Sequence, residues 1–334
     1  MSPWGLLLAK PSAPFSLFGL SPALLLFGMG VLLLQGFFAA QVTLQQQGRI
    51  PLLSPLVWDT PLERSALVIL ILATAISAAL GFVVPLYMQL VQGYSALKTG
   101  IVLLPFAVTV FAGAIASATL ATRFPARPII FWAQMIQVVG LLLLAFTFAN
   151  EWSAGWIVLG LCLCGVTIGV MLSVLSMVLV SASPPELGGD VGALRGTGGK
   201  LGTGLGTALM GLVLSTALSN TAVQLVDQSS VLPAEFKQRL DLSHVQFMSN
   251  AQLEQLIDQS PSIQPAQKTE LLTINQLARL NALRISLLFT TGLVLLGLIP
   301  SRDLPGRQVN GLVTGSGANP TAANPSEDLA VTQE

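Results

Sequence analysis

A glycine-rich stretch, GALRGTGGKLGTGLGTALMG (192–211), has the composition of a phosphate-binding loop. Glycines serve that chemistry because backbone N–H groups can then approach a phosphate closely. A P-loop needs Gly at position 194 and Ser or Thr at position 201, but these residues are Leu194 and Leu201. The dinucleotide pattern G-x-G-x-x-G also fails, because its last position is Leu201 or Thr207. The stretch therefore predicts no phosphate site.

The same stretch makes sense as a membrane helix. Gly198, Gly202 and Gly206 are four residues apart, so they share one helix face. Faces made of small residues let membrane helices approach closely, where van der Waals contact drives packing. We predict that these three glycines form a helix-packing face.

Other residues with chemical potential are few and badly placed for catalysis. His244 lies in a polar stretch, and Cys162 and Cys164 have a spacing that fits neither a disulfide framework nor a CxxC metal site. The apolar runs hold no carboxylate pair, Ser-His-Asp set or metal cluster. We expect no enzymatic activity, no cofactor and no bound metal. The formal net charge of zero gives no reason to expect a nucleic acid partner.

The elements that carry these residues follow from the distribution of charge. Only 9% of the 334 residues are charged, against about 25% in soluble proteins. Most of the charge-free runs reach the roughly 20 residues that cross a bilayer. We predict an all-α polytopic membrane protein with about seven transmembrane helices and the lipid bilayer as partner. The charge-free runs are 22–40, 66–92, 99–122, 128–150, 154–183, 201–219 and 285–300.

Basic residues of the short loops predict the orientation. Only Lys10 and Lys98 lie in the loops on one side of the membrane, whereas eight basic residues lie in the loops on the other side. We expect a plasma (inner) membrane protein with a cytoplasmic C-terminus. The expected layout is an external stub at 1–20, six transmembrane helices within 21–218, an external amphipathic stretch at 219–283, a last span at 284–300 and a disordered cytoplasmic tail at 301–334. The residues of the more basic side are Arg49, Arg64, Arg123, Arg127, Arg195, Lys200, Arg302 and Arg307.

Several motifs together resemble one transporter family. GFVVPLYMQLVQGYSALKTGIVLLP (81–105) resembles a stretch of the fourteen-helix drug:proton antiporter branch of the major facilitator superfamily. ATLATRFPARP (118–128) is similar to the second copy of that superfamily's cytoplasmic loop motif, with Arg123 and Arg127 as its basic residues. The resemblance covers about residues 17–303. It implies half of a major facilitator-type bundle, its C-terminal half, with a separate N-terminal half as the expected partner.

The resemblance also implies a function. It predicts export of drug-like or amphipathic small molecules by proton antiport, with the second, third, fifth and sixth spans lining a central cavity. The alternative is a non-transporting membrane scaffold or regulatory partner, or the product of a truncated transporter gene. For the polar side chains, helix packing or hydrogen bonding between helices is the competing role. The cavity candidates are Ser77, Phe82, Tyr87, Gln89, Phe106 and Thr109.

Overall fold

The described part of the protein is helical throughout. The computed structural model describes residues 22–47, 60–148, 154–182, 187–229 and 265–306, and no β-strand occurs among them. The predicted all-α polytopic fold is thereby confirmed. The elements are α1 (Pro22–Gln46), α2 (Pro61–Leu86), the π-helix η2 (Tyr87–Val91), α3 (Ala96–Arg123), α4 (Ala126–Thr147), α5 (Ala154–Ala182), α6 (Gly188–Gln228), α10 (Pro265–Leu296) and the 3-10 helix η4 (Pro300–Asp303).

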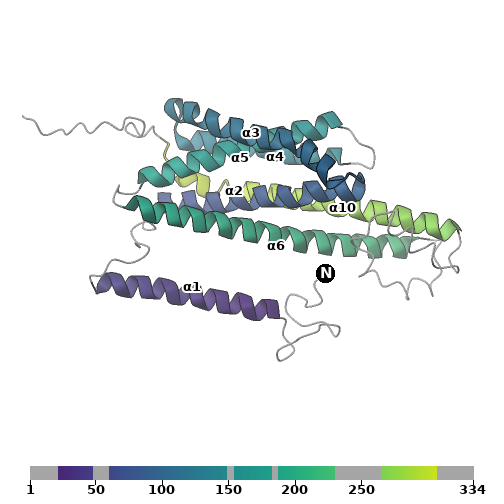
Figure 1. The fold of residues 1–334 in the computed structure, drawn as a ribbon, viewed down its shortest axis with the longest axis horizontal. Coiled ribbons are helices and arrows are strands. Elements are labelled where there is room, and N and C mark those ends of the chain that lie inside the picture. Colours follow the sequence, from purple (N-terminus) through teal and green to yellow (C-terminus); the bar gives the residue numbers. More distant parts are fainter. Residues whose placement is uncertain (1–21, 48–59, 149–153, 183–186, 230–264, 307–334) are drawn as a thin grey trace, which may run out of the picture.

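Six of the described helices are long and apolar enough to cross a membrane: α2 with η2, α3, α4, α5, α6 and α10 with η4. The predicted first span at 22–40 corresponds to α1, whose apolar run, Gly28–Leu44, is shorter. α1 lies apart from the other helices (Figure 1) and makes none of the principal helix–helix contacts. The membrane bundle described here is therefore built from α2 to α10.

Local sequence signals set the ends of α2. Thr60 caps its start in a capping box, in which the Glu63 backbone N–H donates to the Thr60 hydroxyl at 3.2 Å and the Glu63 carboxylate accepts from the Thr60 N–H. Pro85 lies inside the helix near its other end, where the ladder widens into η2. Proline cannot donate the helical hydrogen bond, and π-turns occur where the regular ladder is interrupted. Gly93, with φ +64°, then turns the chain towards α3.

Two expected boundaries differ in the structure. The expected external stretch at 219–283 is divided, because α6 continues to Gln228 and α10 already begins at Pro265, ahead of the expected last span at 284–300. The two extensions stay helical because they pack on each other: Val226 and Ile274 are buried together, and the Ser229 hydroxyl donates to the Glu270 carboxylate at 2.8 Å. The rest of that stretch, including His244, lies outside the described residues.

The expected disordered tail at 301–334 begins with ordered residues. η4 packs against α2 and α4. Leu304, the residue that follows it, is 3% exposed, and the Ser65 hydroxyl of α2 donates to the Asp303 carboxylate at 2.9 Å. These contacts fix the chain as far as the described residues reach, at position 306. Residues 307–334, like the expected stub at 1–20, lie outside the described part.

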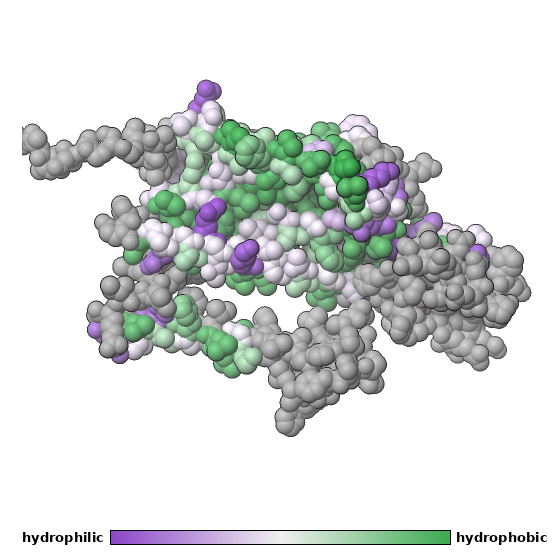
Figure 2. Space-filling model, in the orientation of Figure 1, coloured by the Kyte–Doolittle hydropathy of each residue, from purple (hydrophilic) through white to green (hydrophobic). Residues whose placement is uncertain are grey.

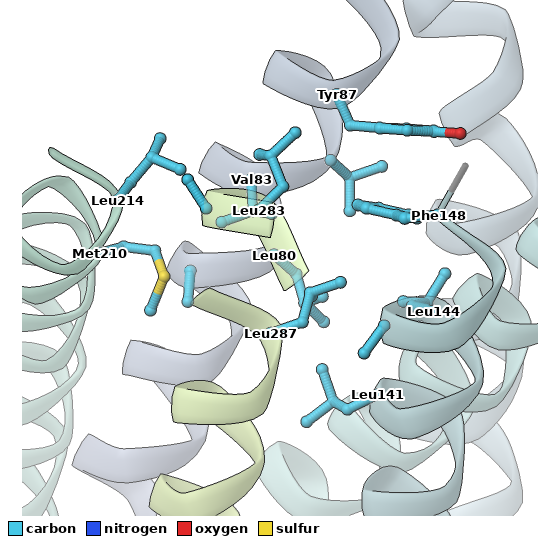
Figure 3. Close-up of a cluster of buried hydrophobic side chains, with 14 of the residues drawn as sticks. Leu80, Val83, Tyr87, Leu141, Leu144, Phe148, Met210, Leu214, Leu283 and Leu287 are labelled. Carbon is cyan, nitrogen blue, oxygen red and sulfur yellow. The ribbon is translucent and has the colours of Figure 1, made fainter. Parts of the chain in front are cut away.

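The described helices pack around two large apolar clusters and a smaller one. α2 packs against α5, α6 and α10, while α3 and α4 pack mainly on α5 (Figure 1). Leucine, valine and aromatic side chains from α2, α4, α6 and α10 fill the centre (Figure 3). α3 is the least buried of the six candidate spans, and its bulky apolar side chains contribute to the hydrophobic surface seen over it in Figure 2. Those exposed α3 residues are Leu97, Ile101, Leu104, Val108, Phe111 and Ile115.

Candidate functional site

The four cavity candidates of α2 and η2 differ in how far they are buried. Ser77 and Phe82 are half-buried, and Phe82 packs against the central core. Gln89, in η2, is exposed. Tyr87 is fully buried, so only Gln89 among these four presents most of its side chain to the outside in this conformation.

Tyr87 lies in the core on the side of α4. Its ring stacks on Phe148 at the end of α4, with ring centroids 3.8 Å apart and planes 9° from parallel (Figure 3). Its hydroxyl accepts a hydrogen bond from Gln92 Nε2 at 2.9 Å. A stacked, hydrogen-bonded aromatic ring anchors two helices to each other. Tyr87 thus joins α2 to α4 here, and does not line an open cavity.

Phe106 and Thr109 lie where α3 meets α5. A Cβ atom on Gly165 of α5 would lie 2.7 Å from the Phe106 carbonyl oxygen and would also overlap the Thr109 hydroxyl. The Thr109 hydroxyl donates to the carbonyls of Pro105 and Phe106, both at 2.9 Å. Its hydrogen bond therefore stays within α3, and the residue packs at a helix–helix contact.

The α3–α5 contact depends on glycines that the sequence interpretation missed. A Cβ on Gly169 would lie 2.9 Å from the Ala114 backbone nitrogen, and one on Gly113 would lie 2.9 Å from the Val166 carbonyl carbon. The sequence spacing of Gly165 and Gly169, a small-xxx-small pair within α5, could have predicted this contact.

Gly198, Gly202 and Gly206 all lie buried against α2. A Cβ on Gly198 would lie 2.8 Å from Leu67 Cδ1, and one on Gly206 would lie 2.6 Å from Ala75 Cα. A Cβ on Gly202 would overlap both Thr74 and the Ile71 carbonyl. The backbone of α6 thus rests directly on α2 along this face.

The opposite side of α6 also carries several small residues, although the exposed side chains of Lys200, Leu201 and Leu205 lie among them, and no described element covers it. A Cβ on Gly196 or Gly204 would meet nothing within 4 Å beyond the backbone of its own helix. Thr203, Thr207 and Ala208 are exposed beside them. The two threonine hydroxyls donate to backbone carbonyls of α6 itself, at 2.9 and 3.0 Å. We call these five residues, 196, 203, 204, 207 and 208, the outer small face of α6.

The predicted loop residues Arg123 and Arg127 are both exposed, at the end of α3 and the start of α4. The Arg127 backbone N–H donates to the Pro305 carbonyl at 3.3 Å. This contact brings the α3–α4 loop next to the segment that follows η4. Neither guanidinium contributes to the core.

Two arginines of α10 were missed as structural residues, although their spacing in NQLARLNALRIS was visible. Arg279 is 4% exposed, and its Nη1 donates to the Leu90 carbonyl of η2 at 2.7 Å. Arg284 donates from Nε and Nη2 to the Phe148 carbonyl, at 3.1 and 2.7 Å. Both bonds satisfy backbone oxygens at the ends of other helices. A small leucine-lined pocket beside Arg279 lies between α2, α6 and α10 and contains none of the predicted cavity residues.

Comparison with known proteins agrees with this architecture. The Major Facilitator Superfamily profile matches residues 1–207. The tetracenomycin C resistance and export protein of Streptomyces glaucescens is 31% identical over 216 residues, which cover 58% of this chain and 37% of that protein. The multidrug resistance protein Stp of Mycobacterium tuberculosis is 30% identical over 135 residues, 40% of this chain and 25% of Stp. The chain thus spans well under half the length of these relatives. It is a multi-pass membrane protein that belongs to the Major Facilitator Superfamily.

Proposed function

We propose that this chain is the C-terminal half of a proton-coupled exporter of drug-like or amphipathic small molecules, and that it works with a matching N-terminal half. Its relatives are named for drug resistance and export, which supports the substrate class. The proposed place is the plasma membrane, with the C-terminus in the cytoplasm. The charge-free runs hold no Asp, Glu or His, so the proton-binding group is assigned to the N-terminal half.

The outer small face of α6 is the observation that carries this proposal. Against lipid, a helix needs only apolar bulk, and α3 has such a surface in Leu104, Val108 and Phe111. A face of Gly, Thr and Ala instead suits close contact with another helix. α6 already uses one such face on α2, so the second one is available to a separate bundle. Access in this superfamily alternates as one bundle rocks against the other.

Reconstitution tests the proposal directly. The purified chain alone in liposomes should show no efflux of cationic dyes driven by a pH gradient, because it supplies half of the cavity wall and its charge-free runs hold no Asp, Glu or His. Co-expression with a matching N-terminal half should give efflux that an uncoupler abolishes. Uncoupler-sensitive efflux by the chain alone would overturn the proposal that an N-terminal half is needed and holds the proton-binding group.

A second candidate function, a non-transporting scaffold or regulatory partner, is favoured by the same charge-free spans. It predicts that the chain binds another membrane protein through α6 but gives no efflux in any combination. Efflux by the co-expressed pair would exclude it. The candidate cavity residues Ser77, Phe82 and Gln89 then become the first targets for substrate-specificity measurements.

A further inference from the structure

Two glutamines of α4 lie in the apolar core of the bundle. Gln134 is 1% exposed and Gln137 is fully buried, one helical turn further along. Gln134 Oε1 and both Gln137 side-chain atoms, Oε1 and Nε2, have no hydrogen-bond partner among the described residues. A buried amide without a partner is costly, and more so inside a membrane, where the lipid offers none. Polar atoms of this kind call for a bound partner.

A glycine at the end of the neighbouring helix lies against one of the two amides. A Cβ on Gly297, which follows the last residue of α10, would lie 2.6 Å from Gln134 Nε2, so this amide lies close against the backbone there. Leu72 of α2 closes the same place, 3.6 Å from that Cβ position. The amide of Gln134 therefore lies where α2, α4 and the end of α10 meet.

The unpaired side-chain atoms of Gln134 and Gln137 indicate which kind of ligand could bind between them. They comprise two acceptor oxygens and one donor nitrogen. A cation would satisfy the oxygens and leave the N–H groups unpaired, and an anion would do the reverse. An apolar ligand would satisfy neither. Water donates two hydrogen bonds and accepts others, and buried waters typically make about three.

We propose that Gln134 and Gln137 hold ordered water inside the membrane core, between α4 and α10. The water bridges the two carboxamides and supplies the hydrogen bonds that no described side chain provides. The contact between α4 and α10 is therefore hydrated at this point, although the packing around it is apolar.

Side-chain NMR of the full chain in lipid nanodiscs tests the proposal. Glutamine side-chain amides are labelled with ¹⁵N, and the signals are assigned by their loss in Gln134→Met and Gln137→Met. We expect the Gln137 NH₂ protons to show cross-peaks to water, as the exposed Gln89 does, assigned by Gln89→Met. Cross-peaks from Gln137 to aliphatic protons alone would show a dry site and overturn the proposal.

Thermal unfolding gives a second, independent readout. Methionine matches glutamine in length but makes no comparable hydrogen bond. If water satisfies the amide, Gln137→Met should leave the melting temperature unchanged or lower it. If the amide is dry, removing it relieves an unpaired polar group and should raise the melting temperature by roughly 2–4 °C or more. Such a rise would contradict the proposal. Gln89→Met is the matched control, and should change nothing because that side chain is exposed.

Discussion

The Arg284 guanidinium of α10 donates two hydrogen bonds to the Phe148 carbonyl oxygen at the end of α4, from Nη2 at 2.7 Å and from Nε at 3.1 Å. The same Phe148 stacks its ring on Tyr87 of η2. One residue thereby joins the ends of α2, α4 and α10. The hydrogen bonds also satisfy a carbonyl that the last turn of α4 leaves free.

Replacing this arginine should loosen that end of the bundle. We expect Arg284→Gln to lower the free energy of unfolding by about 1.5–3 kcal/mol, the usual range for a hydrogen bond to a charged group. Arg284→Lys should recover only part of the loss, since lysine keeps the charge but not the planar fork. Thermal unfolding in nanodiscs measures both. Arg123→Lys, at an exposed arginine, is the control. Equal stability of Arg284→Gln and the unmodified chain would show that the fork contributes nothing.

The glycine face of α6 should tolerate no large side chain. Gly202→Leu would push a side chain into Thr74 and the Ile71 carbonyl of α2, so we expect a loss of at least about 1–3 kcal/mol or failure to fold. Thr203→Leu changes the neighbouring residue, which is exposed, and should be much milder. Thermal-stability assays in detergent compare the melting temperatures of the Gly202→Leu and Thr203→Leu proteins. A Gly202→Leu protein as stable as Thr203→Leu would refute close α2–α6 packing.

The outer small face of α6 should matter only when a second bundle is present. We expect Gly204→Leu to leave the melting temperature of the chain unchanged, because nothing lies within 4 Å of the added Cβ. The same substitution should reduce co-purification with an N-terminal half and the resulting dye efflux several-fold. Gly292→Leu on α10, an exposed glycine whose added Cβ would also meet nothing within 4 Å, is the matched control for added bulk. Undiminished co-purification by Gly204→Leu would place the partner elsewhere.

The orientation can be tested by cysteine labelling. Cys162 and Cys164 are first replaced by alanine, since both are free thiols. Gln267→Cys, near the start of α10, should then react with a membrane-impermeant thiol reagent added outside intact cells, and Gly306→Cys should not. This outcome follows from the excess of basic residues in the loops assigned to the cytoplasm. The reverse labelling pattern would invert the proposed topology.

The sequence by itself determined the fold class and much of the helix layout. Charge-free runs such as 66–92 and 99–122 are long enough to span a bilayer, and in lipid such a run must form a helix to satisfy its own backbone. The four-residue spacing of Gly198, Gly202 and Gly206 likewise places them on one face by helix geometry alone. These properties depend on neighbours along the chain, so they could be predicted without a structure.

The tertiary structure decided where the polar and aromatic side chains lie. Tyr87 and Gln89 are two residues apart in η2, yet one is buried on Phe148 and the other is exposed. Arg284 is the first residue of the expected last span, and its hydrogen bonds to the carbonyl at the end of α4 were not predicted. Hydropathy reports whether a segment prefers lipid to water, but the direction of one side chain depends on which helix packs beside it. That choice is made by contacts between residues far apart in the chain, such as Arg284 and Phe148.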